Sequence, residues 1–314
     1  MEYRNLGNTG LKVSIVGIGC NNFGRRCDAV ATAAVVDAAL DAGVNFFDSA
    51  DIYGPNGLSE EYLGQAIKGK DRSSVIIASK FANPMGAGDL MRGASRRYIM
   101  NAVDASLKRL GTDYIDLYQQ HVPDDQTPIE ETLRALDDLV RSGKVRYIGH
   151  SNFSGWQLTD AHWTARHHSL NAFVTAQNHY SLIDRRIEKD VVPAAQHFGI
   201  GILPYFPLAS GLLTGKYQRG EAAPQGTRLA AWGERGAAAL SEQNFAIVDK
   251  LTAFAQAHDR TLLELAMSWL ATKPYISSVI AGATSVRQVE QNAAAATWRL
   301  SDAEMAEVNE LSTR

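Results

Sequence analysis

Cysteine is scarce in this chain, and its scarcity argues against two classes of protein. Cys20 and Cys27 are the only cysteines among 314 residues. A chain of this length does not need a disulfide framework, and two cysteines cannot build a zinc site without histidine. None of the eight histidines lies in an HxH or HExxH motif, and His162 and His167 are five residues apart. A spacing of four would align two ligands on one helix face. We therefore expect no metal site, and two free thiols in a reducing cytoplasm.

Long basic runs and long apolar runs are also missing. The net charge is −3, and no Lys/Arg cluster indicates a nucleic-acid or membrane-surface partner. No apolar run approaches the roughly 18 residues that a membrane helix needs. The polar start MEYRNLGNTGLKVS is unlike a signal peptide. These features predict a cytoplasmic protein whose partner is a small molecule, and they leave its oligomeric state open.

What the chain does have is a regular alternation of short apolar runs and longer amphipathic runs. Runs typical of strands are 14–19, 44–49, 74–79, 114–120, 145–150, 173–177, 200–205 and 276–282. Runs typical of helices include 29–43, 96–111, 129–143, 156–167, 184–199 and 285–295. Near-continuous apolar strands indicate burial on both faces, hence parallel strands covered by helices. Eight such strands predict one α/β domain over residues 1–314, a (β/α)8 TIM barrel.

Three segments depart from this repeat. Two short runs around Asn8–Gly10 predict an N-terminal β-hairpin that could cap the bottom of the barrel. The glycine-rich stretch 206–241 follows the seventh strand and predicts a long loop on the active face. Trp232 in this loop is either a substrate contact or a packing residue. Additional helices are expected at 242–258, 260–271 and 301–312.

A doubly wound dinucleotide-binding sheet is the alternative fold. The segment GIGCNNFG follows the first strand, but Asn22 stands where the Gly-x-Gly-x-x-Gly fingerprint needs its third glycine. A short-chain dehydrogenase would need a tyrosine with a lysine four residues later. None of the eleven tyrosines has one, so the barrel is the favoured prediction.

Four ionisable residues lie at or just beyond the ends of consecutive predicted strands. Asp48 and Tyr53 follow the second, Lys80 the third and His121 the fourth. A parallel barrel collects its strand ends on one face, where barrel enzymes carry out their chemistry. Taken singly, Asp48 and Lys80 could be a salt bridge at the mouth, and the other two could be ordinary loop residues. Together they predict a proton-donating enzyme site.

The chain resembles the aldo-keto reductase family over essentially its whole length. The segments that carry the resemblance occur in order: NFFDSADIYGPNGLSEEYLGQAI, ASKF, DYIDLYQQHVPD, GKVRYIGHSNFS, AQNHYSLI, PYFPLASGLLTGKY and VIAGATSVRQVEQN. The resemblance implies a (β/α)8 barrel that binds a nicotinamide cofactor without a Rossmann fold. It also implies reversible NAD(P)H-dependent reduction of aldehyde or ketone carbonyls to alcohols.

The resemblance implies catalytic roles for the same four residues. A carbonyl that receives hydride becomes an alkoxide that must be protonated. Tyr53, with a phenol whose free pKa is about 10, would be the acid, and Lys80 would stabilise the phenolate and so lower its pKa. Asp48 would keep Lys80 charged. His121 would donate a second hydrogen bond to the substrate oxygen.

Cofactor contacts are carried over in the same way. Ser151, Asn152 and Gln177 would meet the nicotinamide carboxamide, and Tyr205 would stack on its ring. The loop 207–213 would approach the pyrophosphate, and the helix near 285 would direct its N-terminus at an anion. The full expected set is Ser151, Asn152, Gln177, Tyr205, Pro207, Leu208, Ser210, Gly211, Leu212, Lys216, Gly282, Thr284, Gln288, Gln291 and Asn292.

One departure from the family pattern concerns the choice of cofactor. Many members carry a lysine at the start of the last segment and an arginine on the helix, where this chain has Gly282 and Gln288. Arg287 is adjacent but offset by about 100° around a helix. NADP(H) remains the expected cofactor ahead of NAD(H).

The substrate is expected to be a small carbonyl compound or a sugar. Asn22, Phe23 and Trp232 are the main candidate contacts, with Asn83, Met85, Asp124 and Arg235 as further ones. Two competing functions differ in class. Potassium-channel β subunits resemble this family but carry Asn in place of the catalytic His, whereas this chain has His121. A metal-dependent barrel hydrolase would need clustered ligands.

Overall fold

Eight parallel strands form a closed barrel in the computed structural model, which describes residues 1–313. Hydrogen bonding runs in the order β10-β3-β4-β5-β6-β7-β8-β9. The bounds are β3 (Val16–Gly19), β4 (Phe46–Asp48), β5 (Ile76–Phe81), β6 (Ile115–Gln120), β7 (Val145–Ser151), β8 (Thr175–His179), β9 (Gly201–Tyr205) and β10 (Val279–Gly282). The predicted TIM barrel is therefore confirmed.

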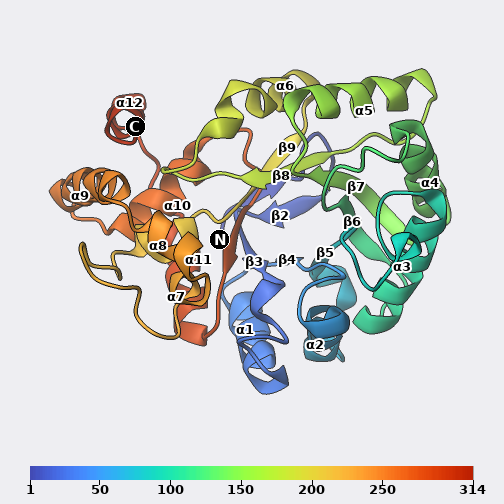
Figure 1. Cartoon of the computed structure of the whole chain (residues 1–314), viewed down its shortest axis with the longest axis horizontal. Coiled ribbons are helices and arrows are strands. Elements are labelled where there is room, and N and C mark those ends of the chain that lie inside the picture. Colours follow the sequence, from blue (N-terminus) through green and yellow to red (C-terminus); the bar gives the residue numbers. More distant parts are fainter. Residues whose placement is uncertain (314) are drawn as a thin grey trace.

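A ring of helices surrounds the barrel, one after each strand (Figure 1). They are α1 (Ala29–Asp41), α2 (Leu58–Ile67), α3 (Arg96–Leu110), α4 (Ile129–Arg141), α5 (Gly155–His167), α6 (Val191–Phe198), α10 (Leu262–Thr272) and α11 (Val286–Ala295). Gly111 and Gly199 end α3 and α6 at φ of 63° and 68°, a left-handed backbone that glycine adopts at little cost. None of the helices within residues 1–313 is long and apolar enough to cross a membrane.

The predicted hairpin is formed by β1 (Tyr3–Asn5) and β2 (Lys12–Ser14), paired antiparallel. Leu6 and Val13 are fully buried and pack in one cluster with barrel-interior side chains such as Phe46, Leu117 and Leu203. The hairpin thus closes the end of the barrel opposite the C-terminal strand ends. The mouth at those C-terminal ends is left for the site.

The remaining helices lie at the side of the barrel that α10 and α11 cover (Figure 1). Within the long loop after β9 the chain forms a 3-10 segment, η6 (Ala209–Thr214), and two short helices, α7 (Arg228–Ala231) and α8 (Glu234–Ala239). They are followed by α9 (Glu242–Ala257), and α12 (Asp302–Leu311) lies near the C-terminus. That residues 1–314 form one domain stays a prediction, and Arg314 lies outside the described residues.

One helix prediction needs correction, and one helix had no prediction. The run 184–199 is not one helix: a 3-10 turn, Arg186–Lys189, precedes α6, which starts at Val191 because the Asp190 side chain accepts a hydrogen bond from its amide. Helix α2 was not predicted. Its Gly64 lies against α3, where a Cβ would stand 2.4 Å from the Leu110 carbonyl oxygen, so a glycine that weakens the helical pattern is required for packing.

Candidate active site

The barrel mouth brings the four predicted ionisable residues together. Asp48 is the last residue of β4, Lys80 lies inside β5, and His121 directly follows β6. The Lys80 Nζ is 2.7 Å from Asp48 Oδ2 and 3.4 Å from Tyr53 Oη, and it also donates to the Ser49 carbonyl at 2.8 Å. The three hydrogen atoms of the ammonium therefore all have acceptors, although Lys80 is fully buried. A buried charge is tolerated only with such partners.

Two glutamines support the carboxylate of Asp48. Gln119 and Gln177 donate their side-chain amides to Asp48 Oδ1 at 3.1 and 3.0 Å. Gln119 was not predicted as a site residue, and Gln177 was expected only as a cofactor contact. Asp48 is thus held by the ammonium on one oxygen and by two amides on the other, which fixes the direction in which Lys80 points.

Burial and charge set the pKa values of Lys80 and of the neighbouring Tyr53. Burial opposes the charged form of Lys80, but the Asp48 carboxylate raises its pKa above the ordinary value, so it stays an ammonium. Burial raises the pKa of the Tyr53 phenol, and the neighbouring ammonium offsets only part of that effect. The expected net lowering of this pKa is not what the site produces. Tyr53 instead holds its proton firmly at neutral pH.

His121 is held as a neutral imidazole beside the phenol. Burial, and next the charge of Lys80, hold its pKa well below the usual range. The ring centroids of His121 and Tyr53 are 5.6 Å apart in an edge arrangement, and the His121 amide donates to the Phe81 carbonyl at 2.9 Å. A neutral imidazole retains one N–H, which can donate to an oxygen in the cavity.

A cavity of about 590 Å³ extends from these residues along the mouth toward α11. It is lined by Asp48, Tyr53 and His121 at one end and by Thr284, Gln288 and Asn292 at the other. The predicted cofactor residues that line it are Ser151, Asn152, Gln177, Tyr205, Pro207, Leu208, Ser210, Gly211, Lys216, Gly282, Thr284, Gln288, Gln291 and Asn292.

The Asn152 carboxamide is already engaged inside the protein. Its Nδ2 donates to the His121 carbonyl at 2.9 Å and to Ser151 Oγ at 3.0 Å, and its Oδ1 accepts from Tyr205 Oη at 2.8 Å. Both amide hydrogens are therefore used. In this arrangement Asn152 braces its neighbours, rather than offering a free donor as expected for a carboxamide contact.

Two of the expected ligand contacts have side chains that belong to the core. Leu212 is 2% exposed and packs in the cluster beneath the loop, and Phe23 is fully buried against α1 and α2 neighbours. Neither lines the cavity. Asn22 does line it, and its Nδ2 donates to the Ala283 carbonyl. Trp232 lies outside the lining and packs on Phe206, with ring centroids 5.7 Å apart.

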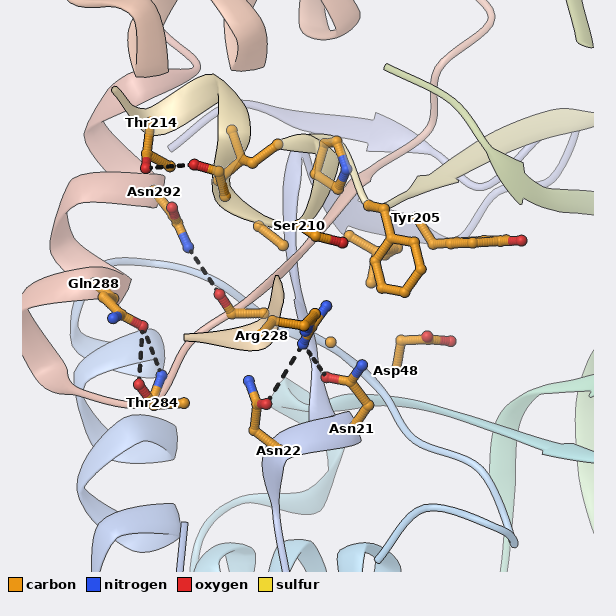
Figure 2. Close-up of a pocket in the computed structure, with 18 of the residues that line it drawn as sticks. Asn21, Asn22, Asp48, Tyr205, Ser210, Thr214, Arg228, Thr284, Gln288 and Asn292 are labelled. Atoms are coloured by element: carbon orange, nitrogen blue, oxygen red, sulfur yellow. Dashed lines mark hydrogen bonds between the residues drawn. The ribbon is translucent and has the colours of Figure 1, made fainter. Parts of the chain in front are cut away.

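Three cations that line the cavity have no carboxylate partner within residues 1–313: Arg26, Lys216 and Arg228. Arg228 donates to the side-chain oxygens of Asn21 and Asn22 at 3.2 and 3.4 Å, as Figure 2 shows. Burial, and next the charge of Arg26, lower the pKa of both Lys216 and Arg228. Such crowding of like charges costs free energy unless an anion relieves it.

A loop-to-loop contact closes over this region. The Arg26 guanidinium, from the segment after β3, donates to the Gly226 carbonyl in the long loop after β9. At the far end of the cavity the Gln288 Oε1 accepts from the Thr284 amide at 2.8 Å (Figure 2). The Ser285 side chain caps α11. A helix N-terminus with unsatisfied amides favours an anion.

The family model described as the aldo/keto reductase family matches residues 15–313. The chain belongs to this family. It is 39% identical over 299 residues to a probable voltage-gated potassium channel subunit beta of Arabidopsis thaliana, covering 93% of this chain and 90% of the relative. An uncharacterized oxidoreductase of Bacillus subtilis, YrpG, is also 39% identical, with 92% and 89% covered. The L-glyceraldehyde 3-phosphate reductase of Escherichia coli K12 is 34% identical, with 93% and 86% covered.

The aldo/keto reductase site also contains residues that sequence reasoning missed. Arg26 and Arg228 lie in polar, glycine-containing segments more than 200 positions apart, so no local pattern indicated that they meet. Phe206 directly follows the predicted site residue Tyr205, and Gln119 lies one position before the end of the predicted strand 114–120. This adjacency is the signal that could have indicated them. The family and its named reductases support an oxidoreductase.

Proposed function

We propose that this protein reduces the carbonyl group of small aldehydes, ketones or sugars with a nicotinamide cofactor, with Tyr53 as the proton donor. The observation that carries the proposal is the buried Asp48–Lys80 pair, 2.7 Å apart, with its ammonium 3.4 Å from the Tyr53 hydroxyl at the end of a long cavity. The reverse oxidation would use the same groups in the opposite direction.

The chemistry of the residues follows from their charges. A nicotinamide cofactor, when bound, supplies the hydride. Tyr53 donates its phenolic proton to the substrate oxygen, and the Lys80 ammonium stabilises the phenolate that remains. Asp48 keeps the ammonium charged and directed at the phenol. A positioned acid of this kind typically contributes about 10²- to 10⁴-fold to the rate.

His121 orients the substrate oxygen in this proposal. As a neutral imidazole that lines the cavity beside Tyr53, it offers one hydrogen bond without competing as an acid. A preorganised donor of this type is worth about 3 kcal/mol in the transition state. Tyr53 then supplies the proton, and His121 holds the substrate oxygen in position.

NADP(H) is the proposed cofactor ahead of NAD(H). A Cβ at Gly282, where many members carry a lysine, would lie 3.7 Å from the Arg228 guanidinium, so Arg228 reaches the place of that absent cation. Arg228, like Arg26 and Lys216, lacks a carboxylate partner within the described chain. Phosphate groups suit such unpaired cations. Ser151, Gln177 and Tyr205 would hold the nicotinamide end, and Thr284, Gln288 and Asn292 the adenosine end.

The reaction is tested by following NADPH oxidation with a panel of small aldehydes and aldoses. Tyr53→Phe should lose at least about 100-fold in turnover, the lower range for a general acid, while its cofactor Kd stays unchanged. Tyr62→Phe is the matched control, because the Tyr62 hydroxyl makes no hydrogen bond within residues 1–313 and does not line the cavity. Preserved turnover in Tyr53→Phe would refute the assignment of the acid.

A channel-associated binding role is the second candidate. Three relatives, from Arabidopsis, rice and fission yeast, carry the name of a voltage-gated potassium channel subunit beta. His121 beside a complete Asp48, Tyr53 and Lys80 set favours turnover instead. Cofactor binding without oxidation by any carbonyl of the panel would favour the binding role.

Both cysteines are free and buried, which fits the proposed cytoplasmic setting.

A further inference from the structure

His179 makes an unusual set of contacts immediately behind the cavity wall. It ends β8 and is paired in register with Tyr205 at the end of β9. The two rings are stacked, with centroids 5.5 Å apart and an interplanar angle of 14°. Tyr205 lines the cavity, whereas His179 does not. The tyrosine ring therefore stands between the histidine and the space where a ligand would lie.

A carboxylate holds His179 in this position. Its Nδ1 is 3.0 Å from Asp184 Oδ2, and the Asp184 side chain is only 15% exposed. Burial alone would raise the pKa of Asp184, but the contacts with His179 and Arg186 lower it well below the ordinary value. Asp184 is thus an ionised acceptor, which selects the imidazole form with hydrogen on Nδ1 and fixes the ring orientation.

From Tyr205 a chain of hydrogen bonds leads to the catalytic end. The Tyr205 hydroxyl donates to Asn152 Oδ1 at 2.8 Å, and Asn152 Nδ2 donates to the His121 carbonyl at 2.9 Å. Asn152 adopts a left-handed backbone, φ 62°, which asparagine tolerates better than most residues. A displacement of Tyr205 would remove the donor to Asn152 Oδ1 and so loosen the carboxamide whose Nδ2 donates to the His121 carbonyl.

We infer that His179, held by Asp184, is a positioning residue: its ring fixes Tyr205 against the cavity, and the Tyr205–Asn152–His121 hydrogen bonds extend that order to the catalytic imidazole. The inference rests on the proposed function, because it concerns how the same site holds a nicotinamide cofactor and its substrate. If His179 only packed at the surface, the loss of its ring would not affect the cavity on the other side of Tyr205.

The test measures cofactor binding as well as turnover. His179→Ala should weaken NADP⁺ binding, measured by titration calorimetry, by about twofold to tenfold, the range of one aromatic pair. The single-turnover rate of NADPH oxidation should fall by a similar factor or more, because small displacements at a site are costly. His179→Phe keeps a stacking ring and should recover most of the cofactor affinity.

His258→Ala is the matched control. The His258 side chain is 35% exposed against 32% for His179, lies on the Phe254 ring and is 3.5 Å from the Glu304 carboxylate. It is part of no cavity lining described above, so its loss should leave Kd and single-turnover rate unchanged. A wild-type-like Kd and rate in folded His179→Ala would overturn the inference. If that variant does not fold, the same comparison is made with Asp184→Ala, which removes the acceptor of the imidazole N–H and should weaken binding at least twofold; unchanged values there would also overturn it.

The result also separates this inference from the proposed function. A wild-type protein that binds NADP⁺ but reduces no carbonyl would refute the proposed reaction, while the Kd values of the His179 variants would still decide the positioning role. A wild-type protein that binds no nicotinamide cofactor would overturn both. Wild-type turnover with an unchanged His179→Ala variant overturns the positioning role alone.

Discussion

The two ends of the cavity balance their charges in opposite ways. At the catalytic end Lys80 is fully buried, and all three of its hydrogens meet acceptors on Asp48, Ser49 and Tyr53. In the part of the cavity proposed to hold the cofactor, here called the cofactor end, Arg26, Lys216 and Arg228 have no carboxylate partner within the described chain. The two kinds of charge can do different things. The Lys80 ammonium, which has a carboxylate partner, acts on the pKa of the neighbouring Tyr53, whereas the cations without a carboxylate partner are available to an anion.

The backbone of the loop after β9 differs from that of the strands that carry Asp48 and Lys80. Asp48 and Lys80 belong to regular strands. In the segment from 206 to 211 three residues other than glycine have positive φ: Phe206 at 53°, Ala209 at 45° and Ser210 at 58°. Such angles cost free energy and occur where surrounding structure or function requires them. The loop after β9 is therefore a strained segment, although positive φ also occurs close to Lys80, at Ala82 (97°).

The largest effect should come from removing the charge of Lys80, which is paired with Asp48. Lys80→Met leaves Asp48 buried with only its two glutamine donors, and breaking a buried pair costs about 3–5 kcal/mol of unfolding free energy. Turnover should fall at least about 100-fold, because the phenolate loses its cation. Urea unfolding and steady-state kinetics measure the two losses. Lys70→Met, which breaks the more exposed pair with Asp37, should cost at most about 1 kcal/mol. Equal effects in the two variants would contradict the comparison.

A second buried charge near the catalytic end should make stability depend on pH. Burial, and next the neighbouring Glu60, raise the pKa of Asp51 from 3.8 to about 7. Between these values the folded protein binds more protons than the unfolded chain. The contribution of Asp51 is thus fully present below pH 4 and is lost as the pH rises to 7, by about 1.4 kcal/mol per pH unit.

Asp51→Asn should remove this loss. The difference in unfolding free energy between variant and wild type, from urea titrations between pH 4 and 8, should shift in favour of the variant as the pH rises. Asp125→Asn, which alters an exposed carboxyl in the loop after β6, is the control and should show no such trend. A pH-independent difference for Asp51→Asn would refute the buried-charge explanation.

Removing one of the cations that lack a carboxylate partner should change the preference between NADPH and NADH rather than the rate of carbonyl reduction. Arg228→Ala should weaken NADPH relative to NADH by about 10-fold to 100-fold, the value of one charge-assisted hydrogen bond. Arg219→Ala is the matched control in the same loop, because Arg219 is already paired with Glu242 and Asp249. The ratio of the two dissociation constants decides the question, and an unchanged ratio in Arg228→Ala would reject the phosphate role.

The smallest effect should come from adding a charge at α11. Gln288→Arg supplies the cation that many family members carry, but it loses the acceptor for the Thr284 amide. We expect a net gain in the NADPH to NADH affinity ratio of only about threefold, within the range of one charge near a helix terminus. Gln291→Arg, one turn later on α11, provides the comparison. No change in either ratio would place this face of the helix away from the phosphate.

The fold and the catalytic end could be predicted from the sequence because their patterns are local. Each strand is a short apolar run, and Asp48, Lys80 and His121 lie within one residue of the ends of the predicted runs. A barrel brings the strand ends together whatever the helices between them do. Helix α2 escaped prediction because its Gly64 serves a contact with Leu110 that the local pattern does not contain.

The cofactor end could be predicted only in part, because side-chain burial in loops is not a local property. Leu212 and Phe23 lie beside residues that line the cavity, yet both turn into the core. Arg26 and Arg228 are each unremarkable in sequence and acquire their importance from proximity. The two stacked rings of His179 and Tyr205 are 26 positions apart and became neighbours through strand register.

By itself, the sequence determined the (β/α)8 barrel and the set of acid, ammonium, carboxylate and imidazole at its mouth. Periodicity and the order of strand ends depend only on nearby residues. Tertiary structure alone decided which groups neutralise each other and which remain unpaired, since electrostatic balance depends on distances between segments that the chain order does not specify.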